Sequence, residues 1–175
     1  MRQLSSLGRL PTLREGRVSL RRPTGADAET LLAGSHDPLV REFAQRADPH
    51  PDQWNCGRAA HFAVLDGDGP AVGWAELVNL RPEEAAADVA VWLLPASRNL
   101  RVAISALRLI CRFGFEQLEL ERIDAHAAAH NMGVQLAGAW IGFRRTDSAP
   151  QRPGGSHTHR LNDAAHATLV PGDLC

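Results

Sequence analysis

One stretch of helical periodicity, at residues 98–118, constrains the fold of this chain more than any other sequence feature. Ala103 and Leu107 recur there at the spacing of one helical face, within a broad apolar stripe. Apolar segments of strand length flank the helix at 88–94 and 122–127. Because strands joined by a helical crossover lie parallel, we predict a βαβ unit and therefore an α/β sheet.

Two more strand-like segments precede this unit, at 60–65 and 71–80. The turn between them, DGDGP at 66–70, is the strongest hairpin signal in the chain. Together with the segment at 88–94 they predict an antiparallel meander of three strands.

The remaining elements are shorter. Thr24 and Asp27 have the spacing of a capping box and begin a predicted helix. The other predicted elements are a strand at 17–22, a second short helix at 37–43, a helix at 131–141, and two final strands at 142–146 and 165–170.

Length and charge exclude several classes of protein. The 175 residues suit one domain, 1–175, in which residues 1–15 are expected to form an N-terminal extension. The formal net charge of -1 gives no summed field for nucleic acid or an anionic membrane, so neither partner is expected. No apolar stretch approaches a membrane span, and we expect a cytoplasmic protein.

Residue usage also limits the chemistry. All 19 basic residues are arginine and the chain has no tyrosine, which removes a lysine nucleophile and a tyrosine acid. Three widely spaced cysteines predict neither disulfides nor a metal site, and Cys111 falls on the buried helical stripe. His157, His159 and His166 have no partners at ligand spacing, so we expect no bound metal.

The order of elements resembles the GNAT superfamily of N-acetyltransferases over nearly the whole chain, from Arg17 to Leu174. The segments that carry the resemblance are DVAVWLLP at 88–95, RNLRVA at 98–103, ERIDAH at 121–126, Asn131, and GFRR at 142–145. Within the superfamily, the strand end WLLP at 92–95 and the closing HATLVPGD at 166–173 resemble the bacterial RimJ/RimL type.

The resemblance implies an α/β (α+β) GNAT fold, with a mixed sheet of about six to seven strands and about four helices. It also implies acetyl-CoA as cofactor, a homodimer, and an amine acceptor that approaches from the opposite side of two splayed strands. By resemblance the cofactor-binding residues are Trp92, Leu93 and Leu94 at the strand edge, Arg98, Asn99, Arg101, Val102, Ala103 and Ile104 at the helix start, and Asn131 near the thioester.

Two positions depart from the family pattern. Arg101 replaces the first glycine of the R/Q-x-x-G-x-G/A loop, and Asn99 replaces another frequent glycine. The Arg101 side chain either obstructs close backbone approach or binds phosphate itself. Val134 and Gly138 occupy the positions of the family's serine or tyrosine acid, so no side-chain acid is expected there.

Asp88 stands where the family often places a glutamate base, and it is the predicted catalytic base. Its alternative interpretation is a solvated carboxylate at a strand start. His61 and Glu76 are lesser candidates, with Glu76 expected on the solvent-facing side of its strand. Asn131 has a structural alternative as the N-cap of the last helix.

These observations lead to two hypotheses. The first is an acetyl-CoA-dependent N-acetyltransferase that acetylates an amine of a small molecule or a protein N-terminus. The alternative is a degenerate GNAT-fold protein that no longer uses acetyl-CoA and acts in binding, in regulation or in different chemistry.

Overall fold

A mixed eight-stranded sheet forms the centre of the protein, in a computed structural model that describes residues 10–38, 40, 59–128, 131–146 and 164–175. The strands lie in the order β1-β2-β3-β4-β5-β6-β8-β7. They comprise β1 (Leu13–Glu15), β2 (Val18–Arg21), β3 (Ala60–Asp66), β4 (Ala71–Arg81), β5 (Ala86–Leu93), β6 (Arg122–Ala128), β7 (Arg144–Arg145) and β8 (Ala164–Leu169). The described α-helices are α1 (Ala28–His36), α4 (Leu100–Gln117) and α5 (Met132–Trp140).

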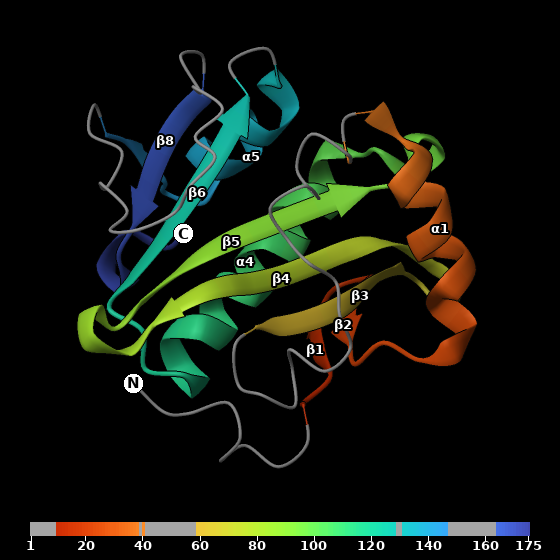
Figure 1. The fold of residues 1–175 in the computed structure, drawn as a ribbon, viewed down its shortest axis with the longest axis horizontal. Helices are drawn as coiled ribbons and strands as arrows, with labels where there is room; N and C mark the ends of the chain where they lie inside the picture. Colours follow the sequence, from red (N-terminus) through yellow and green to blue (C-terminus); the bar gives the residue numbers. More distant parts are fainter. Residues whose placement is uncertain (1–9, 39, 41–58, 129–130, 147–163) are drawn as a thin grey trace, which may run out of the picture.

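The predicted meander and βαβ unit are both present. Strands β3, β4 and β5 pair antiparallel, and β5 pairs parallel with β6 after the crossover through α4. The parallel register runs only from Ala86–Arg122 to Val89–Ala125. Beyond that last pair, β5 and β6 diverge (Figure 1).

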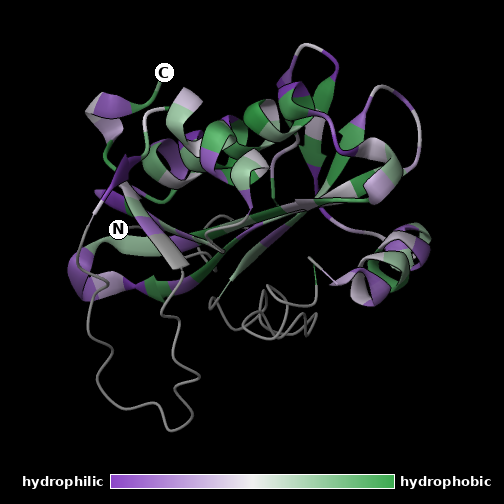
Figure 2. Cartoon of the chain, turned by 90° about the horizontal axis from the view of Figure 1, so that it is seen from above, coloured by the Kyte–Doolittle hydropathy of each residue, from purple (hydrophilic) through white to green (hydrophobic). Residues whose placement is uncertain are grey.

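The helices cover both faces of the sheet. α4 and α5 lie against one face, whereas α1 lies across the other (Figures 1 and 2). The main core fills the α4 face, where Phe62 and Phe113 meet edge to face with ring centroids 5.1 Å apart. Cys111 is fully buried in this core, and burial raises the pKa of its thiol, which confirms its predicted place on the buried stripe.

On the α1 side, Trp74 and Trp92 stack with ring centroids 6.4 Å apart and an interplanar angle of 9°. Gly34 of α1 lies against the Trp92 indole, where an added Cβ would come within 2.4 Å of the ring. The helix can therefore approach the strand closely only because residue 34 has no side chain.

The predicted capping box is present, and it begins a 3-10 turn at Gly25–Asp27 that leads directly into α1. The Asp27 carboxylate accepts the Thr24 backbone N–H at 2.7 Å and both guanidinium nitrogens of Arg21 at 2.7 and 2.8 Å. These hydrogen bonds, led by those from Arg21, hold the pKa of Asp27 below its ordinary value although burial opposes them.

The sheet has more strands than expected, because residues 13–15 of the predicted N-terminal extension form β1. Three residues are too few to show an alternating pattern in sequence. The predicted helix at 37–43 lies mostly outside the described residues, as do His157 and His159. No helix among the described residues is long and apolar enough to cross a membrane.

Candidate active site

A cleft of about 220 Å³ opens where β5 and β6 diverge, with α4 and α5 as its other walls. Most of its lining is apolar. The lining residues are Val40, Val89, Ala90, Val91, Trp92, Leu93, Arg98, Asn99, Leu100, Ala103, Leu107, Ala125, Asn131, Gly133, Val134, Ala137, Gly138 and Phe143.

The β5 wall of the cleft is a strand edge without a strand partner among the described residues. Residues 90–93 pair with β4 on one side, but the pairing with β6 ends at Val89. One edge carbonyl, that of Leu93, accepts a hydrogen bond from Arg98 Nε at 3.3 Å. An extended ligand carrying amide groups can pair with such an edge as an added strand does.

The N-terminus of α4 lies at the end of the same cleft. Asn99 caps the helix, and its side-chain oxygen accepts the backbone N–H of Arg101 at 2.9 Å. The first N–H groups of a helix and its dipole favour an anion such as a pyrophosphate. In this chain one of those N–H groups, that of Arg101, already donates its hydrogen bond to the Asn99 side chain.

Six of the predicted cofactor-binding residues line the cleft: Trp92, Leu93, Arg98, Asn99, Ala103 and Asn131. The other four, Leu94, Arg101, Val102 and Ile104, do not. The Val102 side chain packs into the core, whereas that of Arg101 is exposed to solvent. Any contact from Val102 to a ligand would have to come from its backbone, whereas Arg101 could also use its exposed guanidinium.

Two predicted ligands have structural partners of their own. The Arg98 guanidinium donates to Asp37 Oδ1 at 2.6 Å, so its charge is already paired. Asn131 caps α5 by accepting the Val134 N–H at 3.3 Å and also lines the cleft. The capping role of Asn131 is therefore observed. Because Asn131 also lines the cleft, its contact with a cofactor stays a prediction.

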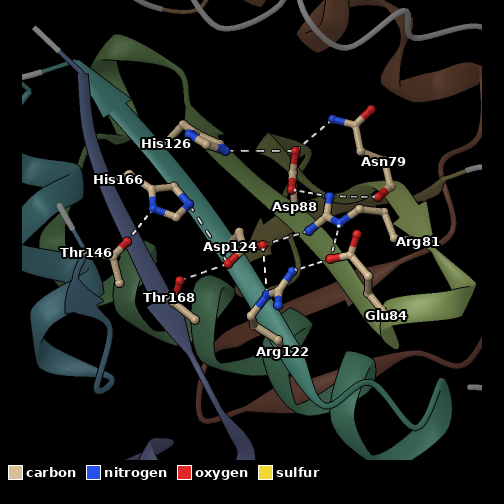
Figure 3. Close-up of polar contacts among 10 residues, drawn as sticks. All are labelled: Asn79, Arg81, Glu84, Asp88, Arg122, Asp124, His126, Thr146, His166 and Thr168. Carbon is tan, nitrogen blue, oxygen red and sulfur yellow. Dashed lines mark hydrogen bonds and ion pairs between the residues drawn. The ribbon is translucent and has the colours of Figure 1, made fainter. Parts of the chain in front are cut away.

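The opposite face of the sheet carries a buried polar network that includes Asp88 (Figure 3). Asp88 accepts hydrogen bonds from Asn79 Nδ2 at 2.8 Å and from Arg81 Nη1 at 2.7 Å. Burial opposes ionisation of Asp88, but these hydrogen bonds and the charges of Arg81 and His126 outweigh it and lower its pKa. Asp88 is thus a buried, ionised carboxylate and not the solvated one that the alternative interpretation expects.

Arg81 connects Asp88 to a second buried carboxylate. Its Nη2 donates to Asp124 Oδ2 at 2.7 Å, and Asp124 also accepts from Arg122 and Thr168. Arg122 in turn donates to Glu84 at 2.5 Å. Three carboxylates and two guanidinium groups leave one unit of negative charge on this network.

Two histidines complete the network. His126 Nε2 lies 4.0 Å from Asp88 Oδ2, and His166 Nε2 lies 4.0 Å from Asp124 Oδ1. The two imidazole rings face each other with centroids 4.7 Å apart, and His166 Nδ1 contacts the Thr146 hydroxyl. Neither His126 nor Arg81 is among the predicted site residues, although strand alternation with Asp124 could have placed His126 on this face.

The prediction that Glu76 faces solvent is wrong. Its carboxylate is buried and lies 2.8 Å from His61 Nδ1 on the neighbouring strand. An alternating pattern identifies the face to which a polar residue points, but it does not reveal that the polar face is itself covered.

The part of the chain that builds this cleft is also matched by a family model. Residues 17–144 match the model described as an acetyltransferase (GNAT) domain. The chain belongs to the GNAT acetyltransferase family. Membership confirms the predicted fold and the expectation of an N-acetyltransferase. No curated protein sequence matches the chain significantly.

Solved GNAT structures resemble the chain closely in fold. RimJ of Mycobacterium smegmatis, in complex with CoA-disulfide, has a TM-score of 0.70 and 20% identity, covering 94% of this chain and 88% of its own. Spermidine N-acetyltransferase from Vibrio cholerae, in complex with CoA and spermine, has a TM-score of 0.71 and 15% identity. The match covers 91% of this chain and 98% of the spermidine acetyltransferase. Ribosomal-protein-S5-alanine acetyltransferase from Vibrio fischeri has a TM-score of 0.70 and 16% identity. The match covers 94% of this chain and 99% of that acetyltransferase.

Proposed function

We propose that this GNAT protein is an acetyl-CoA-dependent N-acetyltransferase that acetylates an amine of a small molecule or a protein N-terminus. The observation that carries the proposal is the β5 edge at residues 90–93, which has no strand partner in the described part of the chain and forms one wall of the cleft. An acyl carrier with amide groups in its arm fits such an edge, and the α4 N-terminus lies at the same cleft for its phosphates.

The similar structures support this cofactor class. Two of them were solved with CoA or a CoA disulfide, and they share the fold over nine-tenths or more of this chain. The Vibrio fischeri enzyme is named for a ribosomal protein, S5, and the Vibrio cholerae enzyme is named for spermidine and holds spermine. For this chain both acceptor types contain the amine that the proposal requires.

The buried network on the opposite face supports a cationic acceptor. That network holds the carboxylates of Asp88, Asp124 and Glu84 against the guanidinium groups of Arg81 and Arg122. A protonated amine is attracted to a site in which carboxylates outnumber guanidinium groups.

Specific observations also favour the second candidate, a GNAT-fold protein that does not use acetyl-CoA. The Asn99 side chain occupies the Arg101 N–H, which the family resemblance assigns to the pyrophosphate. Val134 and Gly138 line the cleft without an acidic proton to donate. Loss of general acid help costs about 10²–10⁴-fold in rate.

Calorimetric titration with acetyl-CoA separates the two candidates before any acceptor is known. Micromolar binding, roughly -8 kcal/mol, is expected for the acetyltransferase. Absence of binding at millimolar cofactor would favour the second candidate.

Two variants show how residue 101 acts. Arg101→Ala removes the guanidinium but keeps Cβ, whereas Arg101→Gly removes both. Weaker binding in both variants indicates that Arg101 binds phosphate, and tighter binding in the glycine variant alone indicates obstruction by Cβ.

A further inference from the structure

His126 and Asp88 flank the opening between β5 and β6 on the face opposite α4. Val89 and Ala125 form the last parallel pair, so Ala90 and His126 are the next residues along the two strands. Ala90 and Ala125 both line the cleft. The His126 imidazole extends from β6 toward Asp88 on β5 (Figure 3).

The distance between these two groups suits a third polar atom. His126 Nε2 and Asp88 Oδ2 are 4.0 Å apart, which exceeds a hydrogen bond. An ammonium nitrogen at the apex of a triangle over these two atoms would be within hydrogen-bond distance of both, in addition to the Asn79 amide that already donates to Asp88 Oδ2. Asp88 is fixed for this contact by Asn79 and Arg81.

The two groups differ in what they can do with a proton. Asp88 is ionised and its lowered pKa makes it a weak proton acceptor. Imidazole is the side chain that exchanges protons near neutral pH, and a nearby carboxylate stabilises its protonated form. The side chain of His126 is also 25% exposed, against 8% for Asp88.

We propose that Asp88 Oδ2 and His126 Nε2 together bind the ammonium group of the acceptor and that His126 takes its proton. This inference rests on the proposed acetyltransferase function. It assigns the role of base to His126, whereas the sequence predicted Asp88 for that role. His126 removes one proton from R–NH₃⁺, and the freed nitrogen lone pair forms the N–C bond to the acyl carbon. The C–S bond breaks with its electron pair on sulfur, the nitrogen's second proton reaches that sulfur, and His126 releases its proton to solvent.

The described groups around His126 favour this role. Asp88 faces it from β5, His166 faces it from β8, and Asp124 lies two residues away on its own strand. Arg81 contacts both aspartates and Arg122 contacts Asp124 and Glu84, so one carboxylate charge of the three has no guanidinium to balance it. The remaining negative charge favours a cationic ligand and an imidazolium.

His61 is the histidine on this face that the sequence offered as a candidate base. Its Nδ1 is oriented by Glu76 at 2.8 Å, but its Nε2 is buried and has no hydrogen-bond partner among the described residues. His61 on β3 is the register partner of Glu76 on β4, and Glu76 is the register partner of Ala90 on β5. Two strand spacings of about 4.8 Å each therefore separate His61 from the opening. His126 is adjacent to the opening, and His61 is not.

NMR of the histidine side chains tests the pair without any ligand or turnover. The His126 resonance, assigned with His126→Gln, is followed as the pH is raised through neutrality. Asp88→Asn is expected to lower its midpoint, because a neighbouring anion is lost. Glu76→Gln is the matched control and should leave that midpoint in place. A His126 midpoint that does not move in Asp88→Asn would overturn the proposal.

Thiol release from acetyl-CoA tests the catalytic step, with spermidine and a serine-initiated tripeptide as probe amines. His126→Gln is expected to bind acetyl-CoA as the parent does, to lose about 10²-fold in rate at pH 7, and to lose the pH dependence near neutrality. His61→Gln should keep the parent's pH profile. Retention of the profile by His126→Gln, or its loss in His61→Gln instead, would overturn the assignment.

The remaining outcomes are also decisive. Acetyl-CoA binding without thiol release for either amine between pH 6 and 9 counts against the proposed amine site. Failure of the parent to bind acetyl-CoA removes the proposed function itself, which calorimetry detects separately.

Discussion

Arg81, at the end of β4, reaches past β5 and donates a hydrogen bond from Nη2 to Asp124 Oδ2 on β6 at 2.7 Å. The same guanidinium contacts Asp88 on β5. One side chain thus joins three strands just before β5 and β6 diverge, and it compensates two buried carboxylates.

Replacing Arg81 is expected to destabilise the protein strongly. Arg81→Met leaves Asp88 and Asp124 without their shared cation, and loss of one partner of a buried ion pair costs about 3–5 kcal/mol. Urea unfolding measures the change. Arg17→Met is the control, because the Arg17–Asp66 pair is exposed and worth about 0–1 kcal/mol. Equal stability losses in the two variants would contradict the structural role of Arg81.

Stability is expected to fall in acid through Asp27 and Asp88. The pKa of each is lower in the folded protein than its ordinary value of 3.8. Both carboxylates therefore stabilise the fold above that value, and the contribution is lost as the pH falls through 3.8 toward the lowered values.

The acid dependence can be measured by urea unfolding between pH 6 and 3. Asp27→Asn should reduce the slope of stability against pH, whereas Asp68→Asn in the exposed β3–β4 turn should not. An unchanged slope in Asp27→Asn would show that the Arg21–Asp27 pair does not stabilise the fold through its charge.

Removing the Asn99 side chain is expected to raise affinity for acetyl-CoA. Asn99→Gly frees the Arg101 N–H at the α4 N-terminus, and glycine in place of an asparagine cap costs only a few tenths of a kcal/mol, about 0.3. Calorimetry should show tighter binding by a few-fold. Weaker binding would mean that the Asn99 side chain itself contacts the cofactor.

A methyl group at position 34 is expected to disturb the Trp92 side of the cleft. The added Cβ of Gly34→Ala would lie 2.4 Å from the Trp92 ring, and such overpacking costs about 1–3 kcal/mol. Tryptophan fluorescence and thermal unfolding report the change. Gly25→Ala is the matched control, because nothing lies within 4 Å of its added Cβ.

Most secondary structure could be predicted from the sequence because its signals are local. The stripe along α4, the DGDGP turn and the alternation in β3 and β4 each depend on neighbouring residues. Strand β1 was missed because three residues carry no periodicity. The cleft-lining residues were predicted in part, since the resemblance identifies a loop but not which side chains point out of it.

The sequence by itself determined the order of elements and the parallel crossover, because periodicity, turn chemistry and the handedness of connections act along the chain. The family was indicated by the resemblance of short motifs such as DVAVWLLP at 88–95. Only the tertiary structure decided which polar residues meet. Arg81 and Asp124 lie 43 residues apart, and His126 and Asp88 come from strands joined by a long helix. Alternation assigns each to a face, but their distance depends on the register of β4, β5 and β6, which packing sets across the whole sheet.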